Sequence, residues 1–361
     1  MTATTQRLRE IGQSLWLDNI TRTMLDDGSL RRYRDEFSVT GLTSNPTIFD
    51  EAIRGSSAYD ASIRALARRG LDGEALFVEL ALDDLRRAAD EFGAVHAASG
   101  GIDGWVSMEV SPLLADDAAA TVAAAQAIHA RAGRANLFVK IPGTPAGLEA
   151  IEATIFAGVP VNVTLLFSRE QYLAAADAWA RGIERRIAAG LDPRVASVAS
   201  VFVSRWDRAV AGRVSAPLAQ GLGIAIARRC DRAYRERLAS PRWRALAAAG
   251  APPQRLLWAS TGVKDPAEWP STYVEALAAP DTIDTMPEKT LQHFASAGRP
   301  PDGMRTDGGD AEATIARYAA AGVDIDALAV QLQRDGAAAF VASWRDLLKR
   351  IAAKSAALED R

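Results

Sequence analysis

The chain has 361 residues and a formal net charge of −3, and 48% of its residues are hydrophobic. This length suits one large domain or two ordinary ones, and the even spread of Lys and Arg argues against a nucleic-acid-binding surface. The single cysteine, Cys230, excludes an intramolecular disulfide and a cysteine-based zinc site. No run of about 18 apolar residues predicts a membrane span, and the first residues lack a signal-peptide pattern. We therefore expect a cytoplasmic protein that binds neither membrane nor nucleic acid.

Eight short segments have the composition of buried strands, being rich in Val, Ile, Leu and Thr and bounded by Gly, Pro or Ser. They begin at Ser14, Phe37, Gly104, Asn136, Val159, Ala196, Gln254 and Asp281. Segments with helical spacing lie between them, such as residues 74–92 and 114–133. Strands that alternate with helices predict a parallel sheet, and eight of them predict a (β/α)8 TIM barrel. A doubly wound open sheet is the main alternative, but no GxGxxG follows the first strand.

The segment after Pro287 reads as helices without further strands. We therefore expect residues 1–361 to form a single (β/α)8 barrel domain, in which residues 288–361 are a helical extension packed on the barrel.

The stretch NLFVKIPGTPAG at residues 136–147 places Lys140 inside an apolar, strand-like run. A lysine in a buried strand loses the hydration that stabilises its ammonium group, which favours the free, nucleophilic amine. The run alone allows two interpretations. Lys140 is either a Schiff-base nucleophile or a lysine at a strand edge with its ammonium in water.

Alternation along the strands favours the first interpretation, because successive side chains of a strand point to opposite faces. In six strands one face is apolar, and the other carries a polar residue near the C-terminal end. In a barrel the second face lines the interior, and the C-terminal ends of the strands build the active site. The side chains expected to converge there are Asp18, Asn45, Glu109, Lys140, Asn162, Thr164 and Ser200.

These residue types suit covalent carbonyl catalysis. A neutral lysine attacks a ketone and loses water to form an iminium ion, which accepts electrons from an adjacent carbon–carbon bond. Two carboxylates divide the proton transfers: one serves imine formation, and the other takes the proton of the hydroxyl group at the cleaving bond. Amides would hold sugar hydroxyls. This chemistry requires no metal and no cofactor.

Five blocks in order resemble motifs of the transaldolase family, of its long type. They are SLWLDN, GLTSNPTIF at residues 41–49, SMEVSP, LFVKIPGTPAGLEAIE at residues 137–152, and NVTLLFS. The resemblance implies a TIM barrel that reversibly transfers a dihydroxyacetone unit from sedoheptulose 7-phosphate to glyceraldehyde 3-phosphate, in the pentose phosphate pathway. It implies Lys140 as the nucleophile, Asp18 as the general base, and Glu109 with Thr164 on the relaying water. Asn45 and Asn162 would bind the donor's hydroxyls.

The resemblance extends to a phosphate site less completely. The block SVFVSR implies Ser200 and Arg205 as phosphate ligands, with Phe202 between them in sequence. Relatives often carry another arginine after the seventh strand, where this chain reads WASTGVKDP, so Lys264, with Ser260 or Thr261 nearby, is expected to take its place. Phosphorylated sugars are the expected partners, and a homodimer is expected because family members often dimerise.

Two alternatives remain at this point. One is a fructose 6-phosphate aldolase, which releases free dihydroxyacetone; such chains are shorter and typically carry Tyr at the position of Phe202. The other is a sugar-phosphate-binding barrel without catalysis, which the presence of Lys140, Asp18 and Glu109 disfavours.

Overall fold

A computed structural model describes residues 2–215, 218, 220–265 and 267–359. Its strands are β1 (Ser14–Asp18), β2 (Val39–Thr43), β3 (Val106–Glu109), β4 (Leu137–Pro142), β5 (Val161–Leu166), β6 (Ser197–Phe202), β7 (Gln254–Ala259) and β8 (Ile283–Met286). Each strand pairs in parallel with the next, and β1 pairs with β8, so the sheet closes into a barrel. The (β/α)8 prediction is confirmed, and the open doubly wound sheet is wrong.

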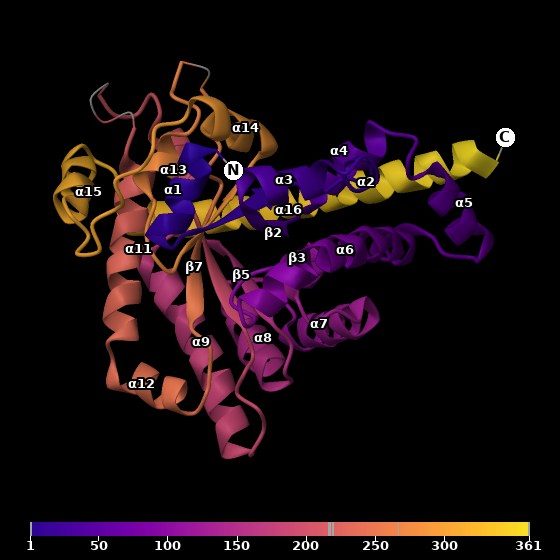
Figure 1. Cartoon of the computed structure of the whole chain (residues 1–361), viewed down its shortest axis with the longest axis horizontal. Helices are drawn as coiled ribbons and strands as arrows, with labels where there is room; N and C mark the ends of the chain where they lie inside the picture. The colour runs from indigo at the N-terminus through magenta and orange to yellow at the C-terminus, as the bar shows by residue number, and fades with distance from the viewer. Residues whose placement is uncertain (1, 216–217, 219, 266, 360–361) are drawn as a thin grey trace.

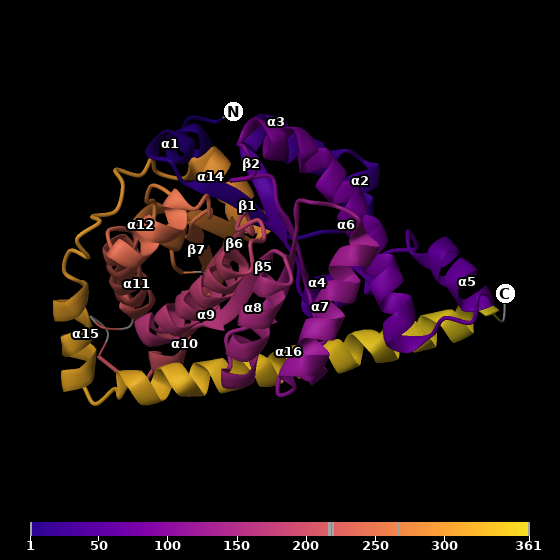
Figure 2. The ribbon, with the colours of Figure 1, turned by 90° about the horizontal axis from the view of Figure 1, so that it is seen from below.

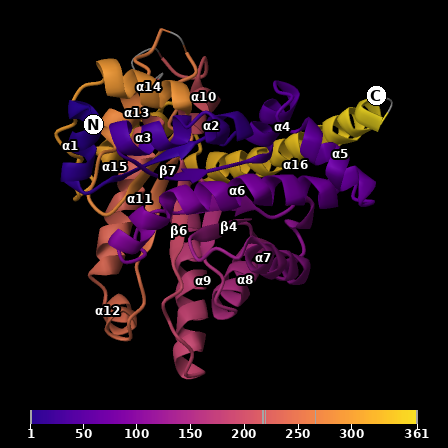
Figure 3. The same ribbon diagram turned by 45° about the vertical axis from the view of Figure 1, so that its right-hand side comes forward.

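Helices surround the strands on the outside of the barrel, with α6 to α9 on one side of it (Figures 1 and 3). Within the described part of the chain, no helix combines the length and apolar character needed to cross a membrane. The helices are α1 (Ala3–Ile11), α2 (Arg22–Asp26), α3 (Ser29–Phe37), α4 (Pro46–Arg54), α5 (Asp60–Arg68), α6 (Gly73–Ala98), η1 (Pro112–Leu114), α7 (Ala118–Ala132), α8 (Pro145–Phe156), α9 (Arg169–Ala188), α10 (Ser204–Val210), α11 (Leu222–Leu238), α12 (Pro241–Ala248), α13 (Thr272–Ala276), α14 (Glu288–Ala297), α15 (Ala311–Ala320) and α16 (Ile325–Glu359).

Two helices begin directly above the barrel because the sequence caps them there. Asn45 accepts a hydrogen bond from the Ile48 amide at the start of α4, and Thr144 accepts one from the Gly147 amide at the start of α8. A proline follows each cap at the first helical position, where its missing N–H costs nothing. The chain therefore turns sharply after β2 and β4, and the ends of both strands stay at the barrel mouth.

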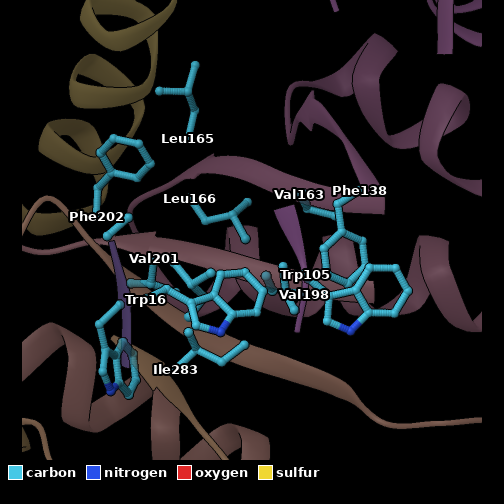
Figure 4. Packing of buried hydrophobic residues seen from close by; sticks show 14 of the residues in the cluster. Trp16, Trp105, Phe138, Val163, Leu165, Leu166, Val198, Val201, Phe202 and Ile283 are labelled. Carbon is cyan, nitrogen blue, oxygen red and sulfur yellow. The ribbon is translucent and has the colours of Figure 1, made fainter. Parts of the chain in front are cut away.

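Aromatic side chains fill the barrel interior below that mouth (Figure 4). Trp16 and Phe138 lie two residues before Asp18 and Lys140, on the same faces of β1 and β4, and their ring centroids are 6.3 Å apart. A side chain on Gly41 would bring its Cβ to 2.8 Å from the Trp16 ring, so only glycine fits at that position of β2. Asp18 and Lys140 are therefore supported from below by packed aromatic side chains.

The long helix α16 runs past the barrel from α15 to α5 (Figure 2). Arg350 pairs with Asp50 of α4, and Ser343 lies 2.9 Å from the hydroxyl of Thr47. The ring of Trp344 packs edge-on against Phe77 of α6 at 5.1 Å. These contacts fix α16 against the elements that follow β2.

Candidate active site

A cavity of about 450 Å³ opens at the C-terminal ends of the strands. Its lining includes the last residues of β1, β2, β6 and β7, together with residues of the loops that follow. The predicted residues among them are Asp18, Asn45, Lys140, Thr164, Ser200, Phe202, Arg205, Ser260 and Lys264. The strand alternation and the resemblance therefore led to residues that surround one cavity, at the end of the barrel where such enzymes act.

Lys140 is buried, with 5% of its surface exposed. Its Nζ donates a hydrogen bond of 2.9 Å to the Ser44 carbonyl and lies 3.2 Å from Oε1 of Glu109. The contact with Glu109 is an ion pair without hydrogen-bond geometry, since neither carboxylate oxygen has a hydrogen-bond partner among the described residues. Lys140 is thus not an exposed edge lysine, and its head group is held beside a proton acceptor.

Both predicted carboxylates lie beside Lys140, and both have pKa values above the ordinary range of their residue types. Burial raises the pKa of Asp18 above its ordinary value, while Lys140 and a 2.7 Å hydrogen bond from Thr43 oppose that rise. Burial likewise raises the pKa of Glu109, and Lys140 again opposes the rise. A carboxylate with a raised pKa is a stronger base, which suits both groups to proton transfer.

Asn162 and Ser200 form a hydrogen-bonded pair at the wall of the cavity. The Ser200 hydroxyl donates to Oδ1 of Asn162 at 2.7 Å, and Nδ2 of Asn162 donates to the Ser107 hydroxyl at 3.2 Å. Asn162 is fully buried, whereas Ser200 is one of the residues that line the cavity. The two strand positions therefore lie together as expected, with Ser200 nearer the open space.

The end of β5 departs from regular alternation. Simple alternation places Leu165 on the outer face with Val163, and this is wrong, because the register shifts between Val163 and Leu166. Leu165 has a φ of 60°, in the left-handed region that bulky residues avoid, and its side chain lies beneath α16. Figure 4 shows Leu165 and Phe202 next to that helix. Such strain concentrates at ligand sites.

Positive charge collects on the side of the cavity opposite Asn45. Arg205 is mostly buried, burial lowers the pKa of its guanidinium, and no carboxylate among the described residues pairs with it. Its guanidinium lies 5.1 Å from the centre of the Phe202 ring. Ser260 has a strained φ of 56°, and the exposed Lys264 follows it on the same loop. An anionic group fits beside these cations.

Sequence reasoning missed several residues of the site. Thr43 and Ser44 lie inside the block GLTSNPTIF, but sequence reasoning assigns neither a role: Ser44 contributes only its carbonyl, and the Thr43 hydroxyl donates to Asp18. Phe340 of α16 also lines the cavity. Helical periodicity signals that one face of α16 is buried, but it carries no information about the surface that the face meets, so only the structure brings Phe340 to the site.

A closed parallel barrel with a buried lysine beside two carboxylates is typical of (β/α)8-barrel enzymes that use a lysine as nucleophile. Residues 15–351 match the profile of the family described as Transaldolase/Fructose-6-phosphate aldolase. A protein of Frankia alni named transaldolase is 46% identical over 355 residues, 96% of this chain and 95% of its own. Proteins with the same name from Acidothermus cellulolyticus and Thiobacillus denitrificans are 44% and 42% identical, each over 96% of this chain and over 95% and 99% of their own lengths. The chain belongs to the transaldolase/fructose-6-phosphate aldolase family.

Proposed function

We propose that the chain is a transaldolase that moves a dihydroxyacetone unit from sedoheptulose 7-phosphate to glyceraldehyde 3-phosphate, giving erythrose 4-phosphate and fructose 6-phosphate. The observation that carries this proposal is the buried amine of Lys140, 3.2 Å from Glu109 in a cavity that also holds Asp18. The relatives named transaldolase support the choice of reaction. We also infer that the protein acts in the cytoplasm, where the phosphate charge of its sugar substrates keeps them from crossing the membrane. We infer that it assembles as a homodimer.

In the steps that form the Schiff base, Lys140 is the nucleophile and Glu109 transfers protons. The Lys140 amine, after giving its proton to Glu109, adds to the ketone carbon of the donor. The resulting carbinolamine loses its hydroxyl as water when Glu109 returns a proton, which leaves an iminium ion. Glu109 Oε1, Oε2 and Thr164 Oγ1 are buried without hydrogen-bond partners among the described residues, so they offer a place for the water that relays these protons.

In the steps that break and form the carbon–carbon bond, Asp18 transfers the proton, and Asn45 and Asn162 help to place the donor. As the bond between the α- and β-carbons of the iminium breaks, its electrons move toward nitrogen and Asp18 takes the proton of the donor's β-hydroxyl. The first aldehyde leaves, and an enamine remains on Lys140. Attack on the second aldehyde reverses these movements, with Asp18 returning the proton. Asn45 at the cavity wall holds the donor's hydroxyls in this scheme, and Asn162, fully buried behind the wall, acts through the Ser200 hydroxyl that it holds.

Arg205, Lys264, Ser200 and Ser260 are proposed to bind the phosphate. Arg205 offers planar, paired donors that match phosphate oxygens, and Lys264 adds a point charge on an exposed stem. Arg205 has no ion-pair partner among the described residues, and a bound phosphate would supply one. Phe202 lies beside Arg205 and has no hydroxyl to protonate the enamine or to direct water, which favours transfer over simple cleavage.

Borohydride trapping tests the proposal. The protein is incubated with fructose 6-phosphate, reduced, digested and analysed by mass spectrometry; a reduced dihydroxyacetone adduct is expected on the peptide that contains Lys140. Lys140→Met should abolish both the adduct and transfer, whereas Lys349→Met, at an exposed position of α16, should change neither. A folded protein that forms no adduct would refute the Schiff base. Release of dihydroxyacetone without transfer would instead favour the aldolase.

A further inference from the structure

A second cavity, of about 240 Å³, lies on the other side of Lys140 from the one described above. It is bounded by the ends of β3, β4 and β5, by the segment after β3, and by α16. The two cavities have three residues in common: Lys140, Thr164 and Phe340. Lys140 therefore faces two separate spaces, and the ring of Phe340 stands at the boundary between them.

The two carboxylates beside Lys140 line different spaces. Asp18 lines the larger cavity, and Glu109 lines the smaller one. Glu109 is 8% exposed, and both of its carboxylate oxygens are buried without hydrogen-bond partners among the described residues. Thr164 Oγ1, at the boundary, is buried in the same way. A space of this size next to unpartnered polar atoms has room for ordered water, whereas the larger cavity has the size and cations that a sugar phosphate needs.

Phe340 keeps its place because α16 is fixed two turns earlier. Nε2 of Gln333 donates to the carbonyl of Gly143 at 3.0 Å and to that of Leu165 at 2.9 Å, which ties the helix to the ends of β4 and β5. At Gly336 the helix touches the barrel so closely that a Cβ would lie 2.9 Å from Leu165. The backbone that carries Phe340, one turn further along, is therefore fixed at the boundary of the two cavities.

We propose that Phe340 determines the specificity of the reaction by separating the water in the smaller cavity from the sugar in the larger one. This inference rests on the proposed function. After donor cleavage, the enamine on Lys140 has two fates. It either attacks the incoming aldehyde, or it takes a proton at carbon and becomes an iminium ion that water attacks. In the second case the water oxygen bonds to the iminium carbon, the carbon–nitrogen bond breaks, and dihydroxyacetone leaves as Lys140 regains a proton. Phe340 disfavours this second fate by limiting the water that reaches the enamine.

The test compares Phe340→Ala with Phe340→Leu and with Arg345→Ala, an exposed substitution on the same helix. Each variant receives fructose 6-phosphate with and without erythrose 4-phosphate, and both dihydroxyacetone release and sedoheptulose 7-phosphate formation are measured. For Phe340→Ala the ratio of release to transfer should rise on the order of tenfold. Phe340→Leu should restore most of the specificity because it refills the boundary, and Arg345→Ala should match the unmodified protein.

The outcomes separate this inference from the proposed function. Borohydride trapping of the unmodified protein on Lys140 establishes the function independently of Phe340. If trapping and transfer succeed but Phe340→Ala leaves the ratio unchanged, the separating role is refuted and the function stands. If release and transfer fall together in Phe340→Ala while circular dichroism shows a folded chain, Phe340 contacts the sugar and does not control water. If the unmodified protein gives no adduct, the proposed function itself fails.

Discussion

Asp284 of β8 is a buried carboxyl group that the proposed reaction does not use, and it should make stability depend on pH. Its Oδ1 accepts a 2.8 Å hydrogen bond from Thr261, while Oδ2 is buried without a partner among the described residues. Burial raises the pKa of Asp284 from 3.8 to about 7. The informative change is Asp284→Asn, which keeps the shape and the acceptor for Thr261 and removes the titration.

The direction in which stability changes with pH follows from proton binding to the folded and unfolded chains. Between pH 3.8 and about pH 7 the folded chain keeps a proton on Asp284 that the unfolded chain has lost, so stability falls as pH rises through this window. The cost is complete above the folded pKa. A difference of about 3 pKa units at 1.36 kcal/mol each corresponds to about 4 kcal/mol in total, of which roughly 3 kcal/mol develops between about pH 5 and pH 8.

Urea unfolding at several pH values measures this effect, with the midpoint of each variant compared with that of the unmodified protein. Below about pH 4 the two should differ little, because a protonated carboxyl and an amide are similarly hydrogen-bonded, and near pH 5 a difference of about 1 kcal/mol should already be present. Near pH 8, Asp284→Asn should be more stable by roughly 4 kcal/mol, so the difference grows by roughly 3 kcal/mol from about pH 5 to pH 8. Asp302→Asn, an exposed control, should show no such trend. Parallel stability curves for Asp284→Asn and the unmodified protein would refute the reasoning.

Three further predictions concern the site. Asp18→Ala should still form the borohydride-trapped adduct with dihydroxyacetone but slow carbon–carbon cleavage by roughly 10²–10⁴-fold; unchanged cleavage in a rapid-quench assay would remove Asp18 from the role of base. Lys264→Ala should raise KM about tenfold for erythrose 4-phosphate and little for erythrose; equal losses would mean that Lys264 does not bind phosphate. Gly336→Ala places a Cβ 3.1 Å from Nη1 of Arg205, so overpacking of about 1–3 kcal/mol should outweigh the gain of about 1 kcal/mol in helix propensity. Its thermal midpoint should fall and its KM for sugar phosphates rise, whereas Gly93→Ala, with nothing within 4 Å, should stabilise α6; a stabilised Gly336→Ala would contradict the close contact.

The barrel could be predicted from sequence because its signals are local. Each strand is a short apolar run bounded by turn residues, and the period of two along each run identified the inward face that carries Asp18 and Lys140. The end of the helix α7 was equally readable, since Gly133 has a φ of 59° and caps the helix in the left-handed conformation. Local chemistry dominates at these positions.

The features that escaped prediction depend on distant parts of the chain. The bulge at Leu165 breaks a period that the sequence displays without interruption, and its strained φ persists because α16 packs on it. Gln333 bonds to Leu165 across 168 positions, which no pattern in either segment announces. Phe340 likewise looks like any apolar residue on the buried side of a helix. For these residues tertiary contacts decide the structure, and a single sequence does not encode them in a readable form.

The position of α16 has a consequence for how the molecule is made. The last strand pairs with the first at Met286, so the barrel can close before residues 333–340 have been synthesised. Ribosomal synthesis runs from the N-terminus, and the long-range docking of α16 comes after the local strand–helix units. A nascent chain that has closed its barrel already presents Lys140 but lacks the roof over it. Acquisition of the fold and acquisition of selectivity are therefore separate events in the life of each molecule.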